Sequence, residues 1–170
     1  LIMRTDLTVV DVLFSTSATA PTMPANYTFK RRIGSIRNNA SSNILAFNQY
    51  PGGLFLWDVP PALDVDTTLG TGATSYTLLT PSGVKCLALF NAICVLSGSV
   101  PNVWIYPVDV TDTATSTTAA PLFSIRSPIS NVLHGSPQQV MTNTSSQVRA
   151  VSSNASTTIR IATMGWVDFR

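Results

Sequence analysis

Two pairs of closely spaced aspartates are the first residues to consider for catalysis or metal binding. Asp64 and Asp66 lie in "LDVDTT", and Asp109 and Asp112 lie in "VDVTDT". Paired carboxylates can cleave a glycosidic bond or bind calcium through their oxygen atoms. Aspartates near strand ends more often accept hydrogen bonds from the backbone of a turn. We therefore expect structural roles for all four and assign none of them to catalysis or to a metal.

The only histidine gives little support to an enzyme. His134 lies beside Gly and Pro in "NVLHGSP", a predicted loop, and neither a serine nucleophile elbow nor a pair of metal ligands surrounds it. The glycine-rich stretch "LGTGATS" lacks the strand-to-helix context and the lysine of a phosphate-binding loop, so it reads as a turn. The sequence therefore predicts a non-enzymatic protein with no catalytic residues, no cofactor and no metal, and it leaves the binding residues unassigned.

The two cysteines, Cys86 and Cys94, lie in the apolar stretch "VKCLALFNAICVL". If this stretch is one strand, their Cα atoms are about 26 Å apart, because a strand rises about 3.3 Å per residue. A disulfide needs Cα atoms within about 7 Å of each other. Without a CxxC motif or a nearby histidine, we expect unpaired, buried thiols that pack as small apolar side chains, as in a protein assembled in a reducing cytoplasm.

The segment "YTFKRRIGSIRNN", residues 27–39, holds four of the ten basic residues of the chain. In a strand over 27–37, Arg31 shares a face with Tyr27 and Phe29, whereas Lys30 and Arg32 lie on the opposite face. A nucleic-acid platform would place basic and aromatic residues on one face, and the net charge of the chain is only +2. We therefore expect no nucleic-acid partner, with Arg31 packed or paired and with Lys30 and Arg32 solvated.

Composition predicts an all-β protein. Charged residues make up 11% of the chain, all eight acidic residues are Asp, and hydrophobic residues make up 45%, which is enough for a core. The absence of Glu and the scarcity of Lys disfavour helices, while abundant Ser and Thr with eleven Pro fit short strands joined by turns. No apolar run reaches the roughly 18 residues of a membrane span, so we expect no membrane insertion.

The consecutive prolines of "PPALDVD" suggest a division of the chain, because proline cannot donate a hydrogen bond to a sheet. Residues 1–58 form a predicted N-terminal β region of two hairpins, with strands at 7–17, 27–37, 44–50 and 54–59. We take this region as the end of a domain that starts upstream. Residues 62–170 contain seven predicted strands at short spacing, which predicts an antiparallel β-sandwich with the jelly roll as one candidate topology.

Two predicted strands are apolar on both faces. Residues 84–95 place Cys86 and Phe90 on one face and Leu87 and Leu89 on the other, and residues 103–108 show the same two-sided pattern around Trp104. A sandwich strand normally buries one face and exposes the other to water. We therefore expect the second faces to be covered by the N-terminal region or by another subunit, in a closed ring of identical copies.

A long part of the N-terminal region carries a resemblance to a known family. The stretch "VVDVLFSTSATAPTMPANYTFKRRIGSIRNNASSNILAFNQ" followed by "FLW", over about residues 9–57, resembles a module of tailed-bacteriophage virion proteins of the tail-fibre and host-attachment type. The most specific parts are "APTMPANYT" and "KRRIGSI", and a looser likeness continues through "LLTPSGVKCLALFNA". The module defines no active-site positions, so none are carried over.

The resemblance implies a structural and adhesive role in the virion, in a tail or head fibre, after assembly in the bacterial host cytoplasm. The implied partners are copies of the same chain, with a homotrimer as the expected form, other virion proteins and a host cell-surface glycan. Two alternatives remain open. One is a carbohydrate-binding β-sandwich, with Trp57, Trp104 or Trp166 stacking on a sugar. The other is a tailspike that degrades glycans, which requires two carboxylates about 5 to 10 Å apart.

Overall fold

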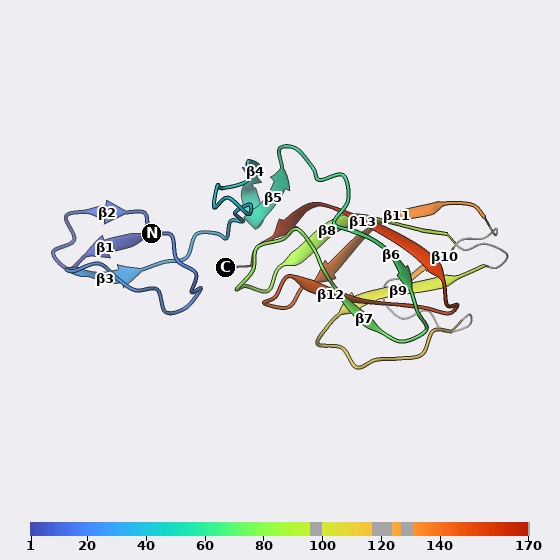
Figure 1. Ribbon diagram of the computed structural model, residues 1–170. Coiled ribbons are helices and arrows are strands. Elements are labelled where there is room, and N and C mark those ends of the chain that lie inside the picture. Colours follow the sequence, from blue (N-terminus) through green and yellow to red (C-terminus); the bar gives the residue numbers. More distant parts are fainter. Residues whose placement is uncertain (96–99, 117–123, 127–130, 170) are drawn as a thin grey trace.

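The computed structural model describes residues 1–95, 100–116, 124–126 and 131–169 (Figure 1). These residues form strands joined by loops, with one 3-10 turn at Pro51–Gly53 and no α-helix among them. Every strand pair that they form is antiparallel. The predicted all-β class is therefore confirmed. The described residues include no helix with the length and hydropathy that crossing a membrane requires.

Eight strands form nested pairs. The inner pairs are β9 (Asn102–Pro107) with β10 (Ser124–Arg126) and β8 (Leu87–Val95) with β11 (His134–Met141). The outer pairs are β7 (Thr74–Thr77) with β12 (Gln147–Ser152) and β6 (Val65–Leu69) with β13 (Thr157–Val167). This order describes a long antiparallel hairpin that rolls up because β8 also pairs with β13 and β9 with β12. The topology is that of a jelly roll, one form of the predicted sandwich.

The rolled hairpin makes two sheets with one core between them. One sheet has the order β10-β9-β12-β7, and the other contains β11-β8-β13 with β6 beside β13. Successive side chains point to opposite faces of a strand, so alternate residues face the core. The core draws on both sheets, and its fully buried members include Ala88, Phe90, Ala92 and Cys94 of β8, Val103 and Ile105 of β9, and Ile159 and Ile161 of β13.

The hairpin of β4 (Phe47–Tyr50) and β5 (Leu54–Trp57) forms around the "PGG" turn, as predicted. It does not belong to a separate N-terminal region, because β5 pairs with β13 and extends the larger sheet. The boundary expected between residues 58 and 62 is therefore wrong. The hairpin can join the larger sheet because β13 is long. Of its eleven residues, the first part pairs with β6 and the last three pair with β5.

Aromatic rings hold this hairpin against β13. The rings of Phe55 and Trp166 stack with their centroids 5.0 Å apart, and Trp57 lies 4.7 Å from Trp166. Phe47 completes the cluster, 5.5 Å from Phe55. The backbones of β5 and β13 approach closely at Gly165, where a Cβ atom would lie 2.1 Å from the carbonyl oxygen of Phe55. Only glycine allows this approach.

A third sheet, made of three short strands, lies at the N-terminal end. Its order places β1 (Ile2–Arg4) between β2 (Val10–Asp11) and β3 (Tyr27–Lys30). The expected hairpin of residues 7–17 with 27–37 is wrong, because β2 and β3 both pair with β1 and β3 already ends at Lys30. Since each is antiparallel to β1, β2 and β3 run in the same direction. The connection over residues 12–26 must therefore cross one face of the sheet. Figure 1 shows this sheet at one end of the molecule.

The second face of β9 is covered by the chain itself. Trp104 and Tyr106 are buried beside Val151 of β12, and Ala73 packs against them. The Tyr106 hydroxyl also donates a hydrogen bond to Asp112, in the segment that follows β9. The expectation that the N-terminal region or another subunit covers this face is therefore wrong for β9. The chain folds back over the sheet at a point that strand patterning did not reveal.

The second face of β8 keeps partial exposure. Leu87, Leu89 and Ile93 are each partly buried, whereas the inward residues between them are fully buried. This face lies on the outside of the larger sheet, with Met141 of β11 paired beside Leu87. The two-sided apolarity of the strand is therefore a real feature, and its cover by another subunit stays a prediction.

Candidate functional site

The first aspartate pair joins strands of the fold. Asp64 directly precedes β6, and its Oδ2 accepts hydrogen bonds from the backbone N–H of Leu79, at 2.9 Å, and from the hydroxyl of Thr163 in β13. Asp66 forms an ion pair with Arg160 of β13, with 3.2 Å between Oδ1 and Nε. The two carboxylates therefore serve separate contacts with the neighbouring strand. Neither is free to act with the other on a substrate.

The second aspartate pair holds the segment that follows β9. Asp109 lies 2.6 Å from the Nζ atom of Lys85, and Asp112 forms an ion pair with Arg149. Asp112 also accepts the hydrogen bond from Tyr106. Burial, followed by this hydrogen bond, raises the pKa of the Tyr106 hydroxyl above its ordinary value. Asp112 therefore holds the segment that follows β9 against β9 and β12, and Asp109 ties the same segment to Lys85, shortly before β8.

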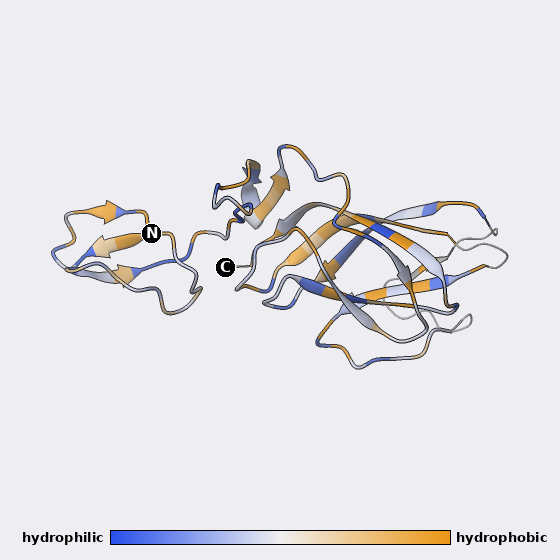
Figure 2. Cartoon of the chain, viewed as in Figure 1, coloured by the Kyte–Doolittle hydropathy of each residue, from blue (hydrophilic) through white to orange (hydrophobic). Residues whose placement is uncertain are grey.

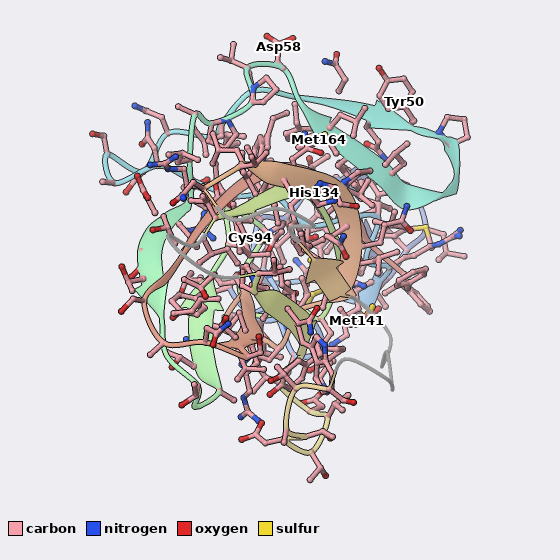
Figure 3. The ribbon with its side chains drawn as sticks, turned by 90° about the vertical axis from the view of Figure 1, so that its right-hand side faces the viewer. Tyr50, Asp58, Cys94, His134, Met141 and Met164 are labelled. Carbon is pink, nitrogen blue, oxygen red and sulfur yellow. The ribbon has the colours of Figure 1, made fainter. Side chains whose placement is uncertain are left out.

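His134 is exposed at the first residue of β11, rather than in the predicted loop, and is paired opposite Cys94 of β8 (Figure 3). Within the described ranges, no three His, Cys, Asp or Glu side chains come together in a way that could hold a metal ion.

The three tryptophans all lie inside the molecule. Trp57 and Trp166 belong to the aromatic cluster on β5 and β13, and Trp104 is covered on β9. A sugar-binding platform needs ring faces open to solvent, so none of these indoles can stack on a carbohydrate. A small apolar hollow beside Trp57, lined by Leu45, Val59 and Leu79 among others, measures about 110 Å³. Ligand sites are usually about 300 Å³ or larger.

Neither Cys86 nor Cys94 forms a disulfide, and both are buried, as predicted. Cys86 packs in the aromatic cluster with Trp166 and lies 3.4 Å from the hydroxyl oxygen of Thr142. Burial raises the pKa of the Cys86 thiol above its ordinary value, and the contact with Thr142 offsets only part of that effect. A thiol kept neutral in this way is a poor nucleophile. The structure therefore gives Cys86 a packing role.

The basic segment makes local contacts, but by a different arginine from the one expected. Arg31 is exposed, whereas Arg32 binds the buried carboxylate of Asp168. Its Nη1 donates to Oδ2 at 2.9 Å, and its Nη2 lies 2.8 Å from Oδ1. The expected role of Arg31 is therefore wrong, because the sheet ends at Lys30 and its alternation does not continue through 31 and 32. The chain turns Arg32 toward the C-terminal residues instead.

Two further basic side chains donate hydrogen bonds to backbone carbonyl oxygens within the molecule. Arg37 donates hydrogen bonds to the carbonyl oxygens of Leu78 and Thr80, and Lys30 donates from Nζ to the carbonyl oxygen of Thr19 at 2.7 Å. Three of the four basic side chains in residues 27–39 thus have partners in the fold. This arrangement does not form a basic surface that could follow a phosphate backbone.

The two faces of the N-terminal sheet differ in their cover. Ile2 is paired opposite Asp11 and Lys30, so these three side chains share a face. Ile2 is only 5% exposed, and Lys30 reaches Thr19 in the crossing connection. The connection over residues 12–26 therefore covers this face. Within residues 1–33, all of which the structure describes, Ile2 is the only buried hydrophobic side chain.

The opposite face is more exposed among the residues that the structure describes. Met3 is paired with Val10 on one side and with Phe29 on the other, so these three side chains share it. Val10 is 61% exposed and Phe29 is 50% exposed, whereas Met3, on the middle strand, is partly buried. We call Met3, Val10 and Phe29 the bare face. Figure 2 shows apolar residues on all three strands of this sheet.

The sequence carried no clear signal for this surface. In "VVDVLF" only Asp11 is charged, and Val9 and Leu13, which alternate with the same set as Asp11, are apolar like the residues at 10, 12 and 14. Only the pairing with β1 shows that the connection over residues 12–26 lies on the face of Ile2 and Asp11. Exposure could not be read from the pattern, because alternation does not say which face a connection crosses.

Comparison with known proteins gives no further guide. No protein-family model matches the chain, and no significant match is found among curated proteins. The functional argument therefore depends on the fold, on the exposed surfaces and on the resemblance of the N-terminal region.

Proposed function

We propose that this chain is a non-enzymatic structural protein of a tailed-bacteriophage virion, part of a tail or head fibre. It associates with copies of itself, a homotrimer being the expected form, and mediates assembly or attachment to the host surface. The resemblance of residues 9–57 supplies the class of protein. The jelly roll supports it by analogy, because viral capsid and lectin domains share this architecture.

One observation carries the assembly role. The N-terminal sheet has three short strands, one buried hydrophobic side chain and the more exposed bare face. Three strands need a packed hydrophobic face to be stable, and monomeric proteins rarely leave such a face open. A protein that works within a larger assembly can leave it to be covered there. Adhesion to a host glycan is a further part of the proposal, and it must use groups other than the buried tryptophans.

The proposal is tested by locating the chain in particles. Phage particles purified from a culture of the source would be analysed by mass spectrometry and by electron microscopy with a gold-labelled antibody against the jelly roll. We expect the chain in particles in several copies, with the label on a fibre at the tail or the head. A chain that is abundant in the lysate and absent from washed particles would contradict the virion role.

A separate experiment on the purified chain tests for an enzymatic role. Purified chain would be incubated with host surface polysaccharide, and the release of reducing ends would be measured. We expect none, because the aspartates that could form a catalytic pair are each engaged in separate contacts. Release that is abolished by Asp66→Asn or Asp112→Asn would show a hydrolase instead.

A further inference from the structure

We infer that three copies of this chain associate through the outer face of the larger sheet, with the faces of the three copies turned toward a common axis. The inference rests on the proposed function, which supplies the expected trimer, and it adds the surface and the partner. By the outer face we mean the residues of β11, β8, β13, β5, β4 and β6 that point away from the core.

Strand register defines the outer face. The alternate residues of β8 that begin at Ala88 are fully buried in the core, so the set that begins at Leu87 points outward. The residues paired with the outward set in β11 and β13, and those paired next in β5, share its face. The apolar members include Leu54, Leu56, Leu89, Ile93, Met141 and Val167, all of them partly buried.

The middle of the outer face is open to solvent in the single chain. Asn91 of β8 and Pro137, its partner in β11, are both exposed, and so is Gln139 opposite Leu89. The Nδ2 atom of Asn91 lies 3.5 Å from the Sδ atom of Met164, which places Met164 on this face as well. The chain thus leaves a largely apolar sheet face to be covered by something else.

The size of the outer face matches what an interface needs. β11, β8 and β13 are extended by β6 at one end and by β5 and β4 at the other, and β8 has nine residues. With strands about 4.8 Å apart and about 3.3 Å per residue, this face measures about 20 to 24 Å by 30 Å, a flat area of roughly 600 to 700 Å². A stable interface buries about 800 Å² on each partner. The outer face alone therefore supplies most of one side of such an interface.

Charge favours identical copies as the occupants. Among the outward residues that the register places, the charged ones are Arg160 and Asp66, and they form an ion pair with 3.2 Å between Nε and Oδ1. The face therefore presents no unpaired charge to a charged partner, and copies of it can meet without like-charge repulsion. Pro137 weighs against joining at the edge of β11 instead, because proline cannot donate a hydrogen bond to an added strand.

Three such faces fit around one axis. Flat faces about 20 to 24 Å wide form a triangle whose sides lie about 6 to 7 Å from its centre. Side chains of one sheet fill about 5 Å, which is half of the roughly 10 Å between sheets packed face to face. The leucine, isoleucine and methionine side chains of the outer face therefore leave little space at the axis. Asn91 carries both a donor and an acceptor, so three copies of its amide can hydrogen-bond to one another without a charged partner.

The test is the mass of the whole chain in solution, residues 1–170, measured by sedimentation equilibrium over about 1 to 100 μM. We expect the mass of three chains in the upper part of this range. Asn91→Asp should raise the concentration of half-assembly at least about tenfold, because it brings three like charges together near the axis. Asn91 is exposed in the single chain and Asp has the same shape, so unfolding of the dilute chain should not change.

Asn26→Asp is the matched control. Asn26 is an exposed residue directly before β3, in the N-terminal sheet, and Asp also tolerates its left-handed backbone conformation, with φ at 67°. This change should leave the assembly as it is in the unaltered chain. Masses of one or two chains throughout the range, or equal effects of Asn91→Asp and Asn26→Asp, would overturn the inference.

The four methionines give a second readout within the unaltered chain. Met141 and Met164 lie on the outer face, whereas Met3 lies in β1 and Met23 in the connection over residues 12–26, and all four are partly buried. Peroxide converts each accessible thioether to a sulfoxide, which mass spectrometry of peptides measures. We expect oxidation of Met141 and Met164 to be several-fold slower in the concentrated sample, with Met3 and Met23 unchanged. Equal rates for Met141 and Met164 at both concentrations would contradict the interface.

The outcomes separate this inference from the proposed function. A chain that is found in virions and is monomeric on its own, with Met141 and Met164 protected only in particles, would assign the outer face to another virion protein and remove the trimer interface alone. A chain that trimerises, loses the trimer with Asn91→Asp and is absent from washed particles would support the interface and remove the virion role.

Discussion

At the scale of single residues, Arg32 shows how a charged side chain in an exposed segment can stabilise the fold. Its guanidinium binds the carboxylate of Asp168, whose side chain is fully buried, and also donates to the carbonyl oxygen of Phe169 at 2.9 Å. A buried carboxylate without its partner costs far more than a lost surface contact. The pair also joins residues 136 positions apart, one shortly after β3 and the other directly after β13.

We therefore predict that Arg32→Ala lowers the free energy of unfolding by about 2 kcal/mol, because it leaves the Asp168 carboxylate buried and unpaired. Arg31→Ala is the matched control, since Arg31 is exposed in the same segment, and it should change stability by less than about 0.5 kcal/mol. Urea denaturation followed by tryptophan fluorescence measures both. Equal effects of the two substitutions would contradict the role given to Arg32.

The thiols allow a chemical test at the same scale. Burial raises the pKa of Cys86 and keeps its thiol neutral and inaccessible, and Cys94 lies fully buried in the core. We predict that neither reacts with a disulfide reagent until the chain unfolds, and that strong reductant leaves the melting temperature unchanged. Absorbance of the released thiolate reports the reaction. Rapid labelling of the native chain would show that the aromatic cluster opens.

The sequence predicted the roles of the cysteines but not the partner of Arg32. The absence of a disulfide between Cys86 and Cys94 followed from strand geometry, because the extended chain separates them too far for a bond. Arg32 and Asp168 could not be paired in advance, since no local pattern links positions so far apart. Alternation assigned the wrong arginine because it assumes a regular strand, and β3 ends before residue 31.

At the scale of elements, the long strand β13 organises one side of the jelly roll. It pairs with β6 and then, beyond a bulge between Thr163 and Gly165, with β5. Near this change of partner, Asp64 accepts hydrogen bonds from the hydroxyl of Thr163 in β13 and from the backbone N–H of Leu79, which follows β7. The hairpin of β4 and β5 is thereby part of the same sheet as the core strands.

Gly165→Ala should be strongly destabilising, by about 3 kcal/mol or more, because the added Cβ would collide with the backbone of β5 at Phe55. Gly72→Ala is the matched control: it has no atom within 4 Å of the added Cβ and no left-handed backbone angle, and its effect should be small. Thermal unfolding compares the two. A Gly165→Ala variant as stable as Gly72→Ala would show that β5 does not pack on β13 as described.

The segment after β9 gives a prediction about pH. The pKa of Tyr106 is raised in the folded chain, so above the ordinary tyrosine value of about 10 the unfolded chain loses its proton first. The folded state then binds more protons, and stability that is fully present below about pH 10 is lost as the pH rises through the raised value. Tyr106→Phe should show a smaller loss of stability than the unaltered chain between about pH 9 and 11. Urea midpoints across this range measure it, and identical slopes would contradict the link.

Sequence patterning found most elements and missed those that depend on long-range pairing. β8 and β13 were predicted because their alternate residues are apolar over many positions. β6 was missed because Asp64 and Asp66 frame its first core residue, Val65, and their partners lie on other strands. The covering of Trp104 and Tyr106 by the chain itself was equally hidden, since it depends on where a loop returns.

At the scale of the whole molecule, the two parts of the chain differ in how they are stabilised. The jelly roll buries one continuous core drawn from both of its sheets. The N-terminal sheet buries Ile2 and leaves the bare face more exposed. A domain with its own core can fold alone, whereas a three-stranded sheet with little buried apolar surface depends on added contacts. We propose that the virion assembly provides those contacts.

Hydrogen exchange of the chain alone and of the chain in purified particles tests this account most directly. Amides of β1 and β3, which pair through Met3 and Phe29, should exchange quickly in the chain alone and slowly in particles. Amides of β8 and β13 should exchange slowly in both. The account is contradicted if the N-terminal amides exchange equally in the two samples, because the sheet would then be stable without the assembly.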